Sequence, residues 1–241
     1  MVQVQNIFTV LLLVAVSVAT GFGQTQDSYE YQSEFTWGIN KNTSGGLIGG
    51  FVFKKSRKLQ ERMLETYGLE IMNVKHPQEV RLNTSYGNFF TYGKNNYLYS
   101  FRFQYGRDFI LFKKAPQQGV EIKAIFAAGP SFGIVAPYYV EWTPDQGQFA
   151  FRQQWNPSIE AIEILGPGRL FEGLGDSKLV VGANIKAALN FELGTFKSQV
   201  TGFEGGFLLD AYTHEIEMVP SAKNYSAYPT LFITFFYGTR K

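Results

Sequence analysis

Hydrophobic and polar side chains alternate along several long segments of the chain. Between residues 97 and 106 the sequence reads YLYSFRFQYG, so aromatic side chains fall on one face of a strand, while Ser100, Arg102 and Gln104 fall on the other. A strand of about ten residues with one apolar and one polar face is typical of a closed membrane β-barrel, where lipid contacts the apolar row. The pattern predicts membrane-spanning strands.

The same alternation recurs along most of the chain. It is longest between residues 178 and 194, and it ends with Leu231, Ile233, Phe235 and Tyr237. We expect eight strands, at residues 30–40, 46–54, 61–75, 95–106, 118–142, 177–194, 199–213 and 228–241. The prediction is an all-β fold, a closed antiparallel up-and-down transmembrane β-barrel. A ten-stranded barrel is the alternative, with a bend or turn in the fifth segment at 129–130 or 136–137 and a separate short strand at 109–112.

Alternation alone does not say which face points outward, because a secreted soluble barrel such as a lipocalin has the same period. The apolar rows here are bulky, and on the outside of a soluble protein they would promote aggregation. The polar rows are rich in glycine and contain both signs of charge, which fits a narrow interior of paired ions. We therefore predict a lumen charge cluster of Glu70, Arg102, Glu121, Lys123, Lys186, Glu192, Glu204 and Asp210.

The connections between the strands differ in length. With the amino end on the periplasmic side, we expect outer connections at 41–45, 76–94, 143–176 and 214–227, and inner ones at 55–60, 107–117 and 195–198. Long outer loops and short inner turns are typical of outer-membrane barrels.

The basic run Lys54–Lys58 is interpreted as a solvated turn. Residues 156–166 carry helix start and stop signals and predict a short surface helix that packs back onto the barrel rim, although it could instead dock on a partner.

Composition agrees with a barrel in the bacterial outer membrane. The 241 residues include 23 Phe and 14 Tyr, enough for the aromatic girdles at the bilayer surfaces, and Tyr138, Tyr139 and Trp142 are interpreted as part of one. A net charge of +2 without a basic stripe gives no reason to expect nucleic acid as a partner. Zero cysteines exclude disulfides, thiolate metal sites and lipid-modified cysteine. Residues 1–23 are interpreted as a signal peptide and residues 24–241 as one barrel domain.

Candidate catalytic chemistry is confined to the predicted outer loops. Some small barrels are lipid A acylases or surface proteases, and such enzymes need a base beside a nucleophile. The chain has two histidines, His76 near Glu79 and His214 near Glu215 and Glu217. Ser85 and Ser221 lie in the same loops. Imidazole and carboxylate also suit a divalent metal. We interpret these residues as a solvated rim, and we expect no catalytic residues, no metal and no cofactor.

The mature chain resembles the small outer-membrane β-barrel proteins common in Bacteroidota over essentially its full length. The segments that carry the resemblance are residues 72–79 (MNVKHPQE), 92–96 (YGKNN), 129–131 (GPS) and the aromatic last strand, 231–237. Barrels of this class usually end on an aromatic residue, whereas this chain continues past Tyr237 to Lys241. The resemblance implies a fold and a location in the outer membrane, but no defined activity.

Eight strands leave an interior that side chains fill, whereas open aqueous pores need about sixteen. We therefore expect a structural or accessory protein that binds other envelope components through its outer loops or its lipid-facing wall. Its expected partners are membrane lipids and other outer-membrane or periplasmic proteins. A narrow solute channel is the alternative, and a lipid- or peptide-modifying enzyme at the outer rim is a weaker one. The sequence leaves open whether the barrel is a monomer or a subunit of a complex.

Overall fold

A closed ring of antiparallel strands makes up most of the molecule. The computed structural model describes residues 31–113, 119–144, 149–169, 172–193 and 198–241, without the side chains of residues 46–48. The predicted signal peptide, residues 1–23, lies outside the described residues. The strands of the ring are β1 (Ser33–Asn42), β2 (Gly46–Gln60), β3 (Met63–Val74), β6 (Asn96–Phe112), β7 (Glu121–Pro137), β11 (Lys178–Leu193), β12 (Gln199–Ile216) and β13 (Tyr225–Arg240).

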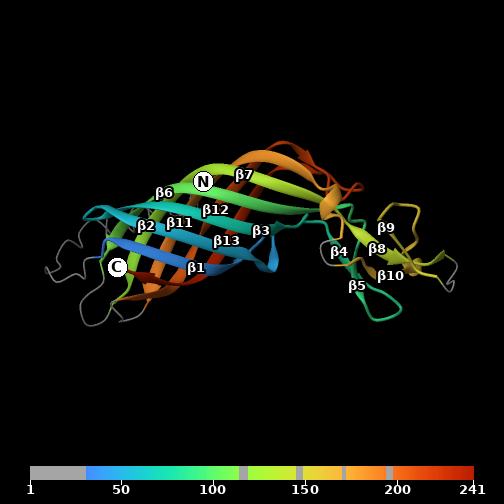
Figure 1. Cartoon of the computed structure of the whole chain (residues 1–241), viewed down its shortest axis with the longest axis horizontal. Coiled ribbons are helices and arrows are strands. Elements are labelled where there is room, and N and C mark those ends of the chain that lie inside the picture. The colour runs from blue at the N-terminus through green and yellow to red at the C-terminus, as the bar shows by residue number, and fades with distance from the viewer. Residues whose placement is uncertain (1–30, 114–118, 145–148, 170–171, 194–197) are drawn as a thin grey trace, which may run out of the picture.

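Each strand of the ring pairs with the ring strands before and after it in the chain, and β1 closes the ring on β13. The closing register runs from Glu34 opposite Arg240 to Asn42 opposite Phe232. The predicted eight-stranded up-and-down barrel is thereby confirmed. In Figure 1 the barrel axis lies along the long axis of the molecule, with the C-terminus at the end away from the smaller sheets.

The ten-stranded alternative is wrong. β7 continues through Gly129 and Pro130, which pair with Asn184 and Ala183 of β11. The amide of Asn184 donates to the carbonyl oxygens of Gly129 and Pro130 at 3.0 and 3.2 Å, so backbone groups beside the proline are satisfied without a turn. Residues 109–112 are the end of β6 and form no separate strand.

The basic run Lys54–Lys58 is part of β2, so its interpretation as a solvated turn was wrong, and the inner turn is confined to Glu61 and Arg62. The alternation continues through the run: Lys54 and Ser56 are buried, while Lys55 and Arg57 are exposed. Lys54 is buried because its ammonium group has carboxylate partners inside the barrel. A run of charges therefore does not end a strand when one face of that strand points at opposite charges.

Beyond one end of the ring, the outer connections fold into two small sheets, which together we call the head (Figure 1). One sheet is the hairpin of β4 (Val80–Asn83) and β5 (Phe89–Tyr92). The other has the order β10-β8-β9, with β8 (Tyr139–Trp142), β9 (Phe151–Gln154) and β10 (Ile164–Pro167). The three strands of this second sheet, β8, β9 and β10, all belong to the connection between β7 and β11.

Two local predictions for this region were wrong. Tyr138, Tyr139 and Trp142 do not form a membrane girdle, because the chain leaves the barrel at Pro137 and these residues enter the head. Residues 156–166 form no surface helix. They contain only the 3-10 turn Ala161–Glu163 (η2), because residues 164–167 pair with β8 as a strand. A second 3-10 turn, η3, spans Leu174–Asp176.

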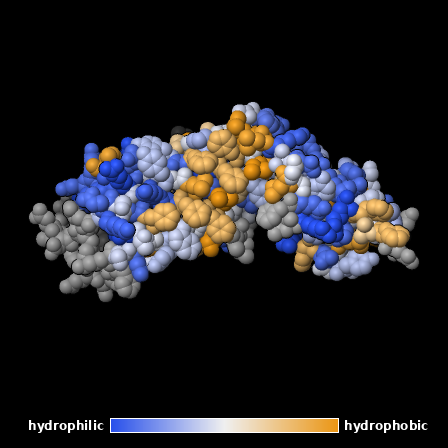
Figure 2. Space-filling view, viewed as in Figure 1, coloured by the Kyte–Doolittle hydropathy of each residue, from blue (hydrophilic) through white to orange (hydrophobic). Residues whose placement is uncertain are grey.

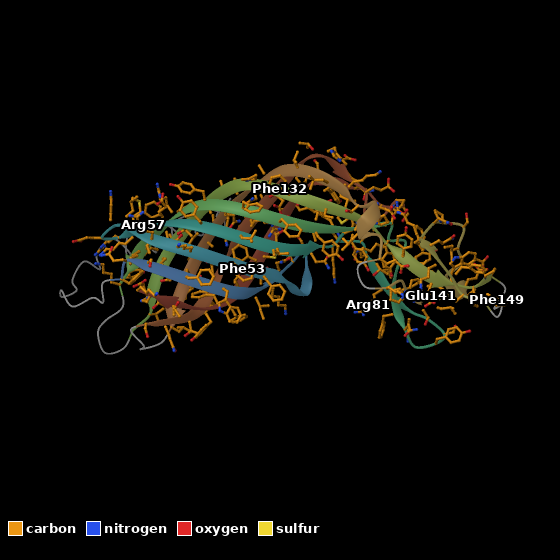
Figure 3. All side chains as sticks on the ribbon, viewed as in Figure 1. Phe53, Arg57, Arg81, Phe132, Glu141 and Phe149 are labelled. Carbon is orange, nitrogen blue, oxygen red and sulfur yellow. The ribbon has the colours of Figure 1, made fainter. Side chains whose placement is uncertain are left out.

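The alternation of the ring strands divides their side chains into an inward row and an outward row. β13 is the clearest case, since its residues alternate between exposed and buried from Ala227 to Arg240. On the face shown in Figure 2, hydrophobic side chains form a band across the middle of the barrel, and Phe53 and Phe132 point outward from the barrel in Figure 3. Among the described residues, no helix is long and apolar enough to cross a membrane.

Lys54 and Lys55 test the division of the side chains into an inward and an outward row. Lys54→Ala should lower the free energy of unfolding in lipid vesicles by about 3–5 kcal/mol, because it leaves the buried Asp108 carboxylate without its cation. Lys55→Ala, on the exposed face of the same strand, should change it by less than about 0.5 kcal/mol. Equal effects of the two substitutions, measured by urea unfolding, would contradict the inward placement of Lys54.

Candidate functional site

The barrel interior contains a continuous chain of alternating charges. Arg102 contacts Asp210 at 2.6 Å and Glu70 at 3.1 Å. Lys186 lies between Glu70, at 2.8 Å, and Glu204, at 2.6 Å. Lys54 continues the chain from Glu204 to Asp108, at 3.2 and 3.1 Å. We call these seven residues the central network; in it every cation lies between two carboxylates.

A second cluster, the inner network, lies nearer the end of the barrel that contains the C-terminus. Lys123 contacts Glu34 and Glu121, both at 3.2 Å, and Glu192 at 3.8 Å. Arg240 pairs with Glu34 at 3.1 Å and also with Glu192. The ring of Tyr31 lies under the Arg240 guanidinium, with its hydroxyl donating to Glu121 at 3.0 Å. The C-terminal strand therefore contributes to the interior as far as its last residue, Arg240.

The eight residues of the predicted lumen charge cluster are all buried and all belong to these two networks. The central network brings together Glu70, Arg102, Lys186, Glu204 and Asp210. The other three, Glu121, Lys123 and Glu192, belong to the inner network.

Sequence reasoning missed four charged members of the networks, Glu34, Lys54, Asp108 and Arg240. Asp108 lies beyond the end of the expected strand 95–106, and Lys54 was assigned to a turn. Glu34 and Arg240 lie within the expected strands 30–40 and 228–241 but were not included in the inward rows. Continuing the period of two through the strand ends would have placed them inward, since each is an even number of residues from a residue of the same inward row.

Neutral polar side chains connect the central network to the barrel wall. Ser131 donates to Asp210 at 2.9 Å, and Asn184 donates to Ser131 at 3.0 Å. Gln104 in turn donates to the Asn184 side-chain oxygen at 3.0 Å. These hydrogen bonds hold Asp210 in position. They also supply partners for polar groups that are buried away from water.

Apolar side chains close the interior toward the head. Val74, Leu98, Val180, Tyr212 and Tyr228 from the strands pack with Ile216, Met218 and Val219 at the β12–β13 connection. The backbone of Met218 accepts a hydrogen bond from Asn95, and Asn224 accepts from the amides of Met218 and Val219. A side chain added at Gly133 would come within 3.0 Å of both Leu98 and Tyr212, so this layer has little free space. The outer end of the interior is packed like a protein core.

The outward rows expose large apolar side chains. Trp37 of β1 is 47% exposed, Phe126 of β7 is 57% exposed and Phe235 of β13 is 64% exposed. Comparable side chains occur on every strand of the ring, including Phe51, Tyr67, Phe103, Ile185 and Phe207. A continuous apolar surface of this kind is not stable in water but is the normal exterior of a barrel in a bilayer.

The head has a hydrophobic core of its own. Phe90 of the β4–β5 hairpin packs with Tyr138, Val140, Trp155, Ile159 and Ile164. Burial raises the pKa of Tyr138, whose hydroxyl accepts a hydrogen bond from the Thr91 amide at 3.1 Å. Ile159, expected on a surface helix, is 3% exposed within this core, whereas Ile162 is 63% exposed. The head is therefore a packed unit in which both sheets contribute.

Polar contacts fasten the head and the outer loops to the barrel rim. Lys94 is 2% exposed, and its ammonium group contacts Glu79 at 2.7 Å and lies 4.5 Å from the centre of the Tyr97 ring. Burial lowers the pKa of Lys94, and the neighbouring Glu79 carboxylate acts in the opposite direction. The amide of Gln154 in β9 donates to Asn95 at 2.8 Å. These contacts restrict how the head can move relative to the strands that carry it.

The two histidines are not arranged as a catalytic pair. His76 is buried, its Nδ1 accepts from the Gln78 amide at 3.2 Å, and its Nε2 donates to the Lys223 carbonyl oxygen at 2.9 Å. Both ring nitrogens are engaged, so neither serves as a base or metal ligand in this arrangement. His214 is exposed, with Thr213 at 3.2 Å from Nδ1. Within the described part of the chain, no group of three or more His, Asp or Glu residues is arranged to hold a metal ion.

The chain is similar in structure to several solved barrels. One is Ail, the attachment invasion locus protein of Yersinia pestis, with a TM-score of 0.40 and 10% identity over 88% of this chain and 99% of that chain. Another is Neisserial surface protein A, with a TM-score of 0.35 and 8% identity over 89% of this chain and 98% of that one.

A third is the N-terminal β-barrel domain of Pseudomonas aeruginosa OprF, with a TM-score of 0.33 and 9% identity over 86% of this chain and 98% of that domain. The sequence matches no protein-family profile and no curated protein. Structural similarities this weak do not indicate a function. The class of protein is therefore inferred from the geometry of the chain itself.

That geometry defines a class of protein. An even-numbered closed antiparallel ring, an apolar exterior, a polar interior and long connections at one end only are together the features of a transmembrane β-barrel of the bacterial outer-membrane type. Eight strands place it at the narrow end of the class, where side chains fill the interior. With this architecture we expect the short turns and the C-terminus on the periplasmic side and the head outside the cell.

The central network predicts a specific pattern of stability. Arg102→Met should lower the free energy of unfolding by about 3–5 kcal/mol, because it leaves Glu70 and Asp210 as buried carboxylates without their shared cation. Adding Glu70→Gln and Asp210→Asn to that variant should recover much of the loss, since no uncompensated charge then remains around position 102. The measurement is urea unfolding in lipid vesicles.

Arg152→Met is the matched control, because Arg152 pairs with Glu141 on the head, where the two side chains are 35% and 34% exposed. It should have little effect on the unfolding of the barrel. If the triple variant were no more stable than Arg102→Met, the loss would arise from packing and not from charge.

Proposed function

We propose that the chain is a non-conducting anchor that presents its head to another component of the bacterial envelope. The barrel supplies a rigid, ion-paired support in the outer membrane, and the head supplies the binding surface. The role is structural or accessory, with no catalytic step. The restriction to a Bacteroidota-type family, suggested by the segments at 72–79, 92–96 and 129–131, belongs to this proposal.

Exposed aromatic side chains on the head are the observation that carries the proposal. Phe149 is 75% exposed, Tyr86 is 66% exposed and Phe89 is 55% exposed, although all three lie in the part of the molecule that extends beyond the barrel. Phe149 and Arg81 are seen on the head in Figure 3, far from the hydrophobic band. Because the head extends beyond the apolar wall of the barrel, contact of that wall with lipid does not explain this exposure, which favours contact with a partner.

The local chemistry of the hairpin also favours recognition. The guanidinium group of Arg81 lies 4.7 Å from the centre of the Phe89 ring, so an aromatic and a cationic side chain form one surface. Aromatic residues and arginine are enriched where proteins bind one another. The packed core beneath this surface holds it in one shape, which reduces the entropy lost on binding.

The interior favours an anchor over a channel. The central network spans the lumen from β12 through Arg102 and Glu70 to Lys54 on β2, and the apolar layer around Tyr212 and Met218 lies above it. Conduction would require separating ion pairs whose members are almost completely buried, which is energetically costly.

We predict that the purified full-length protein in planar bilayers gives no steady ohmic conductance. The ion-paired interior should block ions even at high salt, because buried pairs are screened little by salt. Reproducible conductance steps of fixed size would contradict the anchor and favour the narrow channel, provided that Arg102→Met changes their size.

We predict that a photo-crosslinking amino acid at position 149 or 86, introduced into the protein in its native cells, yields a discrete covalent adduct with an envelope component. The matched control is position 235, which is 64% exposed but lies on the barrel wall. A Phe89→Ala/Phe151→Ala change should reduce the adduct from position 149 by at least about tenfold, since removing two interface aromatics costs more than about 1.4 kcal/mol.

Absence of an adduct from both head positions would contradict the proposal. The same adduct from position 235 would also contradict it, because the contact would then be made by the membrane wall and not by the head. The identity of the crosslinked molecule, read by mass spectrometry, distinguishes a protein partner from a lipid or glycan.

A further inference from the structure

The charges on the outward face of the barrel are distributed unevenly between its two ends. At the inner end, exposed or half-buried basic residues surround the turn between β2 and β3 and the end of β6, and we call them the basic collar: Lys55, Arg57, Arg62, Arg107 and Lys113. The outward-facing carboxylates described at this end of β2, β3 and β6 are Glu61 and Glu65. Arg57 lies at the end of the barrel opposite the head in Figure 3.

Three members of this region form one cross-strand row. Arg57 of β2 is opposite Glu65 of β3, which is opposite Arg107 of β6. Glu65 accepts from Arg107 at 3.0 Å and from the Tyr105 hydroxyl at 2.8 Å, and Arg57 occupies the register position on its other side, so two cations flank one carboxylate. The row therefore keeps a net positive charge. At the outer end, by contrast, acidic residues outnumber basic ones, six to three, between residues 139 and 178.

A hollow in the lipid-facing wall begins at this row. Its volume is about 600 Å³, and it extends across β6, β7 and β11 from Arg107 toward the middle of the barrel. The outward-facing side chains that line it are Tyr105, Phe109, Phe126, Ala128, Ile185 and Ala187. It exists because the small Ala128 and Ala187 side chains lie between bulky aromatic and aliphatic neighbours. The register places Arg107 beside Phe126 and Phe126 beside Ala187.

We propose that the collar and the hollow together form a binding site for one anionic phospholipid of the periplasm-facing leaflet. The acidic headgroup contacts the collar beside Arg107 and Arg57, and an acyl chain occupies the apolar hollow. The two features are independent observations, one of charge and one of shape, and they meet at Arg107.

A phospholipid fits this surface better than an acidic polymer of the periplasm. The hollow lies within the wall that contacts the bilayer, so a ligand must have a hydrocarbon chain to reach it. The collar lies at the end of the same wall, at the depth where headgroups of the inner leaflet lie, and basic side chains there attract anionic lipid. The site depends on the membrane placement of the barrel but not on what the head binds.

The test uses the full-length protein refolded in neutral detergent, with phosphatidylglycerol and phosphatidylcholine of identical acyl chains added separately. Native mass spectrometry counts the lipids bound to each barrel. The wild-type protein should bind one phosphatidylglycerol more tightly than phosphatidylcholine. Arg57→Gln/Arg107→Gln should weaken phosphatidylglycerol binding by about fivefold for each charge removed and leave phosphatidylcholine binding unchanged.

Ala187→Phe should weaken the binding of both lipids, because the added ring fills the hollow. Ala183→Phe is the matched control on the same strand and the same outward face but outside the hollow, and it should bind both lipids as the wild type does. Lys41→Gln/Lys178→Gln, at the outer end, should keep the preference for phosphatidylglycerol.

Equal affinity of the wild type for the two lipids would overturn the role of the collar. Unchanged binding by Ala187→Phe would overturn the role of the hollow. Far-ultraviolet circular dichroism verifies that each variant is folded, and Ala187→Phe tests the site even if the arginine variant fails to refold. A missing crosslink from the head leaves these results unaffected, so the two proposals fail separately.

Discussion

The fold depends on the pairing of opposite charges inside a narrow ring whose interior is filled by side chains. Eight strands leave only enough space for the side chains that point inward, and five of those side chains are cations from Lys54 to Arg240. Each of them contacts at least two carboxylates. A buried charge without a partner would be costly, so the strands are held in a register that brings these partners together. The same alternation then turns most of the large apolar side chains of each strand outward.

The outer wall of the barrel and the surface of the head differ in composition because they contact different surroundings. The outward rows contact lipid, and they carry few charges except near the strand ends, with Arg57 and Arg107 at the inner end and Lys41 and Lys178 at the outer end. The head has its own core around Tyr138 and Trp155 and leaves aromatic side chains such as Phe149 exposed. In the proposed function, the head makes contacts outside the membrane, and the ion-paired barrel supports it.

The barrel could be predicted from the sequence because the alternation with a period of two is a local property of each strand. Arg102 and Glu70 could be placed in the interior without knowing that they lie opposite each other. Strand ends were less predictable: Asp108 was lost because the strand was ended at residue 106, and Lys54 because a basic run was taken for a turn. In both cases the partner that allows burial is remote in the chain, and a single strand contains no information about it.

The head was predictable only as a set of long connections. Its strands have four residues each, too short to show a period, and its core joins Phe90 to Trp155 across more than sixty positions. The helix start predicted from Asn156 and Pro157 was wrong; the Asn156 side chain instead accepts a hydrogen bond from the Ser158 amide at 2.9 Å. The following residues became a strand because pairing with β8 outweighed helix propensity.

The most direct measurement of the central claim is quenching of tryptophan fluorescence by lipids brominated along their acyl chains. Trp37 lies on the outward face of β1, whereas Trp155 is buried in the head, so two single-tryptophan variants isolate the two environments. The account predicts strong quenching for the variant that keeps Trp37 and little for the variant that keeps Trp155. If Trp37 were unaffected by brominated lipid but quenched by iodide in the buffer, its face of the barrel would meet water, and the placement of the charges inside and the apolar rows in lipid would be contradicted.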